Sequence, residues 1–149
     1  MTRTQFRGIA LSLVAVFSIG TSSAFAQDAA AVCDGLTIVS LAPSKAKSAI
    51  DGELTTFSFD MTAVVENAGD AALSPAAPLA VTLASGEEVL ATQDVTTLAP
   101  GEQVTLVTKA SKWSPYTNYG FAVSIGSGEA DGCTLGLDGS QLEQMLRGQ

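Results

Sequence analysis

A strict two-residue alternation of apolar and polar residues begins near Leu54 and limits the folds open to this chain. The apolar residues share one parity and the polar residues between them share the other: Phe57, Phe59, Met61, Ala63 and Val65 against Thr56, Ser58, Asp60 and Thr62. Successive side chains of a β strand point to opposite faces, so this pattern predicts a half-buried strand over 54–65. The turn-forming run ENAGD at 66–70 is expected to end it.

The same alternation predicts six more strands, at 36–41, 79–84, 89–95, 104–108, 121–125 and 133–137. Turn signals lie between them, among them SGEE at 85–88, LAPGE at 98–102 and GSG at 126–128. No intervening segment has a helical period long enough to cross between parallel strands, which excludes a parallel α/β fold. Seven strands at this spacing predict an all-β fold, a seven-stranded β-sandwich.

A short helix is expected over 140–149, after a sandwich domain that spans 27–139. Ser140 followed by Glu143 fits a capping box at the start of this helix. The apolar side of the helix would hold Leu142, Met145 and Leu146. Because a helix of about two turns is marginal in water by itself, it must dock. Docking on its own domain is the default, and docking on a partner is the alternative.

The first 26 residues have the three parts of a secretory signal peptide. Arg3 and Arg7 supply a positive start, the apolar run at 9–19 is too short for a membrane-spanning helix, and AFA at 24–26 is a small-x-small cleavage site. We therefore predict cleavage after Ala26 and a periplasmic or secreted product with no membrane anchor.

The charge balance excludes two classes of partner. Cleavage would remove two of the seven basic residues and none of the fifteen acidic ones, which leaves five against fifteen and a net charge of −10. A chain this acidic is not expected to bind nucleic acid or an anionic membrane through bulk electrostatics.

The two cysteines, Cys33 and Cys133, are expected to form a disulfide in an oxidising compartment. The alternative is a pair of reactive or metal-binding thiols, which is disfavoured because the sequence has no histidine to complete a zinc site. If consecutive strands alternate in direction, the first and the seventh begin at the same end, and each begins near a cysteine. A bridge closing a loop of about 100 residues is worth roughly 4 to 5 kcal/mol in the chain-entropy model.

The run from Val64 to Val107 resembles the bacterial cell-adhesion-related domain, CARDB. Three motifs carry the resemblance: NAGD at 67–70, GE at 86–87 and LAPGE at 98–102, which match the N-x-G-D, G-[E/D] and L-x-P-G-E elements of that family. The resemblance implies an immunoglobulin-like β-sandwich that serves as an extracellular binding or spacer module. It carries over no catalytic residues.

Strand direction also predicts which loops share an end of the molecule. The end opposite the cysteines is expected to collect a basic and aromatic surface, with candidate partner-binding residues Lys45, Lys47, Lys112, Trp113 and Tyr116. Aromatic side chains give large contact area at low entropic cost, and Tyr116, beside Pro115, is the best candidate for an exposed anchor. For Trp113 the favoured interpretation is that it caps the end of the core, and Tyr119 is expected to pack at the start of its strand.

The cysteine end is expected to be acidic, and calcium is a weak candidate there through Asp70, Glu129 and Asp131. Calcium needs six to eight oxygen ligands, and no Asp-x-Asp-x-Asp run is present. The alternative is a solvated acidic rim, and no cofactor is expected.

Catalysis is not expected, because the chain lacks histidine, the usual general base, and has no nucleophile elbow or phosphate-binding loop. The sequence therefore predicts a secreted or periplasmic, non-enzymatic, adhesion-type binding module for a protein or glycan. The alternative is a structural or accessory subunit of a surface assembly, joined by edge-strand pairing.

Overall fold

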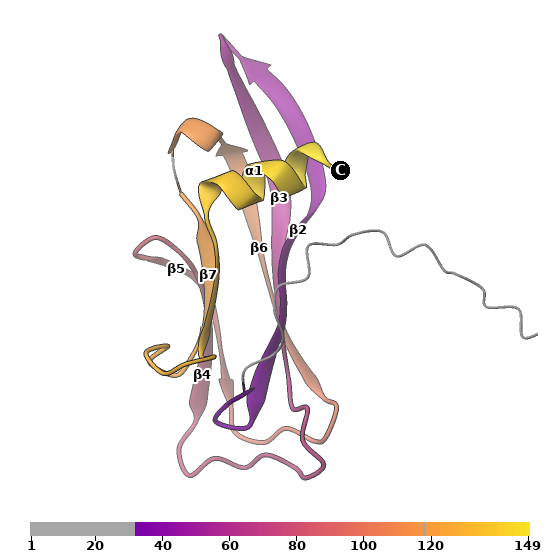
Figure 1. The fold of residues 1–149 in the computed structure, drawn as a ribbon, viewed down its shortest axis with the longest axis vertical. Helices are drawn as coiled ribbons and strands as arrows, with labels where there is room; N and C mark the ends of the chain where they lie inside the picture. Colours follow the sequence, from indigo (N-terminus) through magenta and orange to yellow (C-terminus); the bar gives the residue numbers. More distant parts are fainter. Residues whose placement is uncertain (1–31, 118) are drawn as a thin grey trace, which may run out of the picture.

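The computed structural model describes residues 32–117 and 119–149 (Figure 1). The predicted signal peptide and its cleavage site lie outside these residues. The described elements, in chain order, are β1 (Val32–Cys33), β2 (Leu36–Asp51), β3 (Leu54–Glu66), β4 (Leu79–Ser85), β5 (Glu88–Val95), β6 (Gln103–Trp113), the 3-10 helix η1 (Pro115–Thr117), β7 (Phe121–Ile125), β8 (Thr134–Leu137) and the α-helix α1 (Gly139–Arg147).

The strands form two antiparallel four-stranded sheets, with the orders β1-β2-β3-β6 and β5-β4-β7-β8. The sheets face each other across one hydrophobic core (Figure 1). Both sheets supply residues with no exposed surface, among them Met61 and Val65 from β3, Val81 from β4 and Val123 from β7. The expectation of an all-β fold with a short C-terminal helix is confirmed at this level.

The predicted count of seven strands is wrong, because a two-residue strand, β1, precedes the predicted first strand. Cys33 pairs with Leu36 across the turn formed by Asp34 and Gly35. Both turn residues have positive φ, 49° and 84°, as a type I′ turn requires. Asp-Gly is a favoured dipeptide for this turn. The extra strand therefore follows from local turn chemistry rather than from hydrophobic alternation.

The β2–β3 hairpin extends much further than the sequence predicts. Strand β2 continues to Asp51, and Asp51 pairs with Leu54 across a two-residue loop. Gly52, with φ of 66°, takes the first position of this loop, where a type II′ turn places glycine. The distal part of the hairpin, residues 47–58, projects beyond α1 (Figure 1). We call it the arm.

The turns that carry the CARDB-like motifs bond to each other. The buried side chain of Asn67 donates to the carbonyls of Ala71 and Leu98, both at 2.9 Å, and accepts from the N–H of Gly69 at 3.0 Å. The LAPGE motif at 98–102 adds a backbone hydrogen bond from Gly101 to the Asn67 carbonyl, at 2.7 Å. The motif residues therefore fix the chain where it passes between the sheets.

Helix α1 docks on its own domain, which confirms the default expectation. Leu142 and Leu146 are buried, and the helix lies across the end of the molecule from which the arm projects (Figure 1). The predicted cap is wrong. Asp138 is the N-cap and accepts from the N–H of Gln141 at 2.8 Å, while the Gln141 side chain accepts from the N–H of Asp138 at 3.0 Å. Ser140 lies inside the first turn.

In the described part of the chain, no helix is long and apolar enough to cross a membrane.

Candidate partner-binding surface

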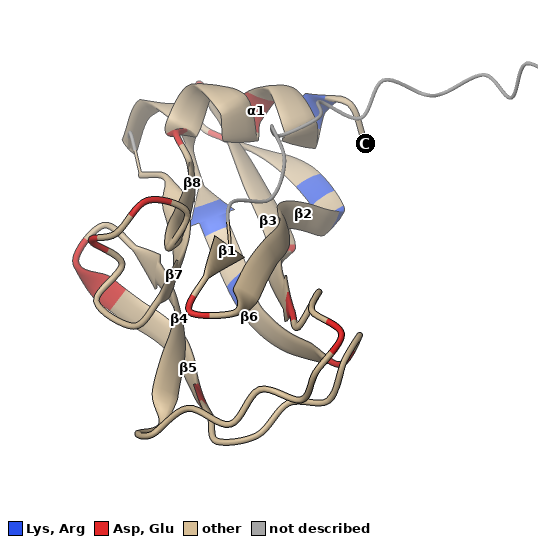
Figure 2. Cartoon of the chain, turned by 60° about the horizontal axis from the view of Figure 1, so that its bottom comes forward, with Lys and Arg blue, Asp and Glu red and all other residues tan. Residues whose placement is uncertain are grey.

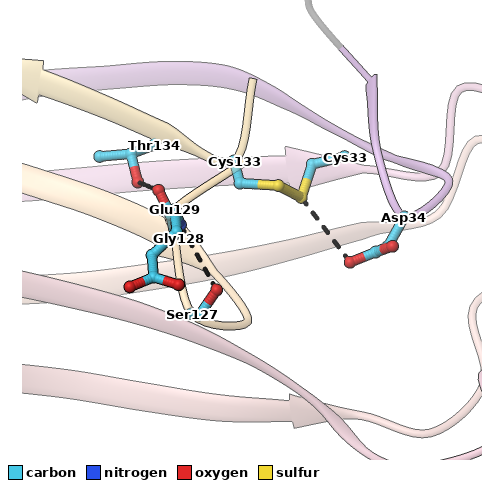
Figure 3. The surroundings of a disulfide bond; sticks show 7 residues. All are labelled: Cys33, Asp34, Ser127, Gly128, Glu129, Cys133 and Thr134. Carbon is cyan, nitrogen blue, oxygen red and sulfur yellow. Dashed lines mark hydrogen bonds between the residues drawn. A yellow bond between two sulfur atoms is a disulfide. The ribbon is translucent and has the colours of Figure 1, made fainter. Parts of the chain in front are cut away.

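The structure joins Cys33 and Cys133 in a disulfide, as predicted (Figure 3). Their Cα atoms lie 5.0 Å apart, and both residues are buried. A carboxylate oxygen of Asp34 lies 3.9 Å from Cys33 Sγ, a contact rather than a hydrogen bond because a disulfide sulfur carries no proton. These three residues form the one cluster of metal-ligand types within the described residues. Since thiolate is the form that binds metal, the bonded sulfurs do not make a metal site.

The weak calcium candidate is not supported by the geometry. Glu129 and Asp131 lie in the exposed β7–β8 loop, and Asp70 lies in the β3–β4 connection. Across residues 32–117 and 119–149, these three carboxylates do not converge to ligand distance. The β7–β8 loop is instead held by its own residues, because the Thr134 hydroxyl donates to the Gly128 carbonyl at 2.8 Å (Figure 3).

Trp113 is a core residue, which agrees with the favoured interpretation of the sequence and removes it from the candidate partner-binding residues. It is 6% exposed, its indole N–H donates to the Tyr119 carbonyl at 3.0 Å, and its ring lies 6.2 Å from those of Phe57 and Phe59. A bulge in β6 explains this burial, because the pairing of β6 with Phe57 and Phe59 includes one extra β6 residue. The extra residue changes the parity of the strand and turns Trp113 inward.

The two tyrosines behave differently from Trp113. Tyr116 is 78% exposed in η1, where its N–H donates to the Ser114 hydroxyl at 3.3 Å, so the expectation of an exposed anchor agrees with its position. Tyr119 is 58% exposed rather than packed at the start of β7. The buried Ser114 holds the turn, since its carbonyl also accepts from the Thr117 hydroxyl at 2.6 Å.

The three candidate lysines lie on strands rather than in loops. Lys45 and Lys112 each occupy a bulge with φ of 55°, and Lys47 lies on the arm. Lys112 is 3.9 Å from Asp51 across the exposed end of the sheet. Lysines on β2 and β6 therefore lie among acidic residues, and the end opposite the disulfide carries both signs of charge (Figure 2). The predicted basic surface is corrected to a mixed one.

Lys45 forms the closest ion pair of this group, with Asp60 at 2.9 Å. The hydrogen bond from Lys45 holds the pKa of Asp60 below its ordinary value, and desolvation partly opposes this effect. The same hydrogen bond raises the pKa of Lys45. Lys45 is therefore engaged within the domain and is less available to a partner than Lys47.

Two exposed apolar residues at the tip of the arm were missed by the sequence analysis. Ile50 is 82% exposed and Leu54 is 46% exposed. The signal was present, because Gly52 lies between the apolar residues Ile50 and Leu54, and glycine at the first loop position is typical of a type II′ hairpin. We call Lys47, Ile50, Leu54, Lys112 and Tyr116 the distal surface.

A groove of about 410 Å³ lies between the arm and α1. The Arg147 guanidinium sits 5.9 Å from the centre of the Phe57 ring and pairs with Glu143 at 2.6 Å. The groove is lined by Ala46, Ser48, Thr55, Phe57, Leu146, Arg147 and Gln149. It lies at the base of the arm, on the face that continues from the core.

Comparison with protein families finds no matching family model, and comparison with curated proteins finds no match. The CARDB resemblance is therefore not supported by a family match. Among solved structures, a domain (272-376) of a "putative cell surface protein" from Methanosarcina acetivorans is 21% identical, with a TM-score of 0.39. The similarity covers 66% of this chain and 87% of that one. A likeness this distant identifies neither a fold nor a function.

Proposed function

We propose that this chain is an exported, non-enzymatic binding module whose distal surface engages a protein or glycan partner. The observation that carries the proposal is the projecting arm, whose tip exposes Ile50 and Leu54 beyond the rest of the domain (Figure 1). Exposed Tyr116 lies at the same end of the molecule. Apolar and aromatic side chains at such a tip supply the anchors that interfaces use, and the mixed charges of Lys47, Asp51 and Lys112 would form their polar rim.

An immunoglobulin-like arrangement is part of this proposal. With β2 counted as the first strand, strands one, two and five share a sheet, and strands three, four, six and seven share the other. This division supports an immunoglobulin-like order in which the fourth strand lies beside the third. Such sandwiches present binding loops and hairpins at their ends, and the distal surface occupies one end.

Export and the absence of catalysis complete the proposal. The predicted signal peptide and the disulfide support an oxidising compartment. A non-enzymatic role is supported by the lack of histidine and by the pairing of both cysteines, which removes the commonest general base and the thiol nucleophile.

The test begins with ligands selected without bias, from a printed array of bacterial surface glycans and a phage-displayed peptide library. Titration calorimetry then compares the original protein with the Ile50→Ser and Tyr116→Ala variants. We expect each variant to weaken binding of the selected ligand by tenfold or more, as truncation of an interface anchor does. The matched control is Val32→Ser, which changes a residue that is 64% exposed at the disulfide end.

An affinity that falls with Val32→Ser but not with the distal variants would place binding elsewhere and reject the proposal. Failure to select any ligand with the original protein would also reject it.

The second candidate function, a subunit joined by edge-strand pairing, is favoured by a separate observation. In the described residues, the outer edge of β2 pairs with β1 only at Leu36 and Thr37. The rest of this long strand has an open edge, which is the feature that strand addition requires.

A further inference from the structure

The outer edge of β2 is bonded by the Gln149 side chain at Pro43 and Ala46, and no described residue bonds to it beyond Ala46. Pro43 has no N–H, and its carbonyl accepts from the Gln149 side-chain amide at 2.8 Å. The Ala46 N–H donates to the carbonyl oxygen of the same Gln149 side chain at 3.4 Å. A bulge at residues 45–46 interrupts the pairing of β2 with β3 between Ser44 and Lys47. The free edge is therefore residues 47–51.

The backbone of this segment has a defined pattern of open groups. Asp51 and Leu54 flank a two-residue loop, so they bond to each other. Antiparallel pairing then directs the N–H and C=O groups of alternate residues, Asp51, Ala49 and Lys47, toward β3. Ser48 and Ile50 direct theirs outward. No other described residue forms a hydrogen bond to these outward groups.

The sequence of the free edge, KSAID, is self-complementary when read antiparallel. We infer that a second copy of this chain pairs with it, about a two-fold axis that passes through Ala49. Lys47 of each copy then faces Asp51 of the other, and Ser48 faces Ile50. This register brings the outward groups of Ser48 and Ile50 into hydrogen-bonded pairs, and it places alanine against alanine at the close, non-hydrogen-bonded position.

The side chains available to this register are exposed. The Asp51 side chain is 68% exposed and is held only by a 3.9 Å contact to Lys112, so it can turn to a Lys47 across the new pair. Ile50 is 82% exposed, and in this register the two Ile50 side chains are diagonal neighbours within reach of each other. Association therefore covers the most exposed large apolar residue of the described chain and joins two opposite-charge pairs.

The shape of the molecule permits this pairing. Because the arm projects beyond α1, two arms that overlap antiparallel carry their domains away from each other (Figure 1). The other edge strand of the sheet, β6, lies against β5 of the opposite sheet. The arm edge is thus the accessible one. This pairing deepens the second candidate function, edge-strand association, and does not depend on ligand binding by the distal surface.

Charge reversal tests the register. Sedimentation of the purified, disulfide-bonded protein is expected to show a monomer–dimer equilibrium below roughly 1 mM, because one short strand pair lies at the small end of specific interfaces. Lys47→Asp and Asp51→Lys should each weaken self-association by at least tenfold, since each places like charges opposite one another. An equimolar mixture of the two variants should form a heterodimer, and the double variant should self-associate again.

Bulk charge makes the opposite prediction for one variant. If net negative charge alone controlled association, Asp51→Lys would strengthen it, because that change makes the net charge less negative by two units. The matched control is Lys109→Asp, the same change as Lys47→Asp made on an exposed residue of β6, and it should leave the dimer unchanged. A monomeric original protein up to that concentration overturns the inference. So does a dimer that survives Lys47→Asp, or one that Lys109→Asp disrupts equally.

Discussion

The two ends of this domain use their polar and apolar residues in opposite ways. At the disulfide end, polar turn residues form their hydrogen bonds within the domain. Asn67 is 2% exposed and makes three side-chain hydrogen bonds, and both cysteines are buried and joined in the disulfide. At the distal end, Ile50 and Tyr116 are 82% and 78% exposed. The difference shows that turn residues at the disulfide end stabilise the fold, whereas large side chains at the distal end are left exposed, where the proposed binding would use them.

The largest effect should come from the disulfide. Replacement of Cys33 and Cys133 by alanine releases a link with a sequence separation of 100 residues, and we expect it to lower the free energy of unfolding by about 4 kcal/mol in the chain-entropy model. Urea unfolding followed by tryptophan fluorescence measures this loss, because Trp113 lies in the core. A loss below about 1 kcal/mol would contradict the assignment of stability to this end.

Leu142→Ala tests whether the distal end has a well-packed interior beneath its exposed surface. Leu142 has no exposed area beneath α1, so truncation should cost about 3 kcal/mol through lost burial and an added cavity. The matched control, Gln144→Ala on the exposed side of the same helix, should stay within about 0.5 kcal/mol. Equal effects of the two changes would show that α1 contributes little to the folded domain.

Asn67→Ala should lower the free energy of unfolding by about 2 kcal/mol, since it removes the side-chain partner of the Ala71 carbonyl and of the Gly69 N–H. The Leu98 carbonyl would keep its hydrogen bond from the Leu73 N–H. Asp70→Ala is the control, because Asp70 belongs to the same turn but is exposed. Chemical denaturation of both variants measures the difference. If the two losses match, the Asn67 hydrogen bonds do not contribute as described.

A pH titration sharpens the comparison at the Lys45–Asp60 pair. The pKa of Asp60 lies below its ordinary 3.8 in the folded state, so its contribution is present above that pH and is lost as the pH falls through the folded value. The raised pKa of Lys45 adds a contribution that is lost only when the pH rises beyond 10.5. The free energy of unfolding of the Lys45→Met variant should therefore be lower than that of the original protein between these pH limits. The difference should vanish in stronger acid. A difference independent of pH would exclude the ion pair as its source.

Ile50→Ser should have the smallest effect on folding, within about 0.5 kcal/mol, because the side chain is 82% exposed. The same change should weaken ligand binding, so it separates stability from recognition. A melting temperature markedly below that of the original protein would mean that the arm stabilises the fold.

Elements with clear alternation could be predicted closely, and those shaped by turns or bulges could not. The structure gives β7 the predicted bounds, Phe121–Ile125, and extends the predicted strand at 79–84 by one residue. The β2 side of the arm, residues 47–51, was not predicted because every residue of it is exposed, and a strand without a buried face has no reason to alternate. The burial of Trp113 does not follow from the alternation of its strand, because the one extra residue of the β6 bulge reverses its face.

The disulfide also decides how the domain responds to mechanical force. Tension applied to the chain before Cys33 and after Cys133 passes through the sulfur–sulfur bond and bypasses every strand between them. Strands β2 to β7 then carry no load, while β8 and α1, which follow Cys133, remain in the path of the force. The segment between the cysteines behaves as a nearly inextensible link. Reduction would release residues 34–132, which span roughly 330 Å when extended. Redox state would thus convert the same chain from a stiff link into a long, compliant one.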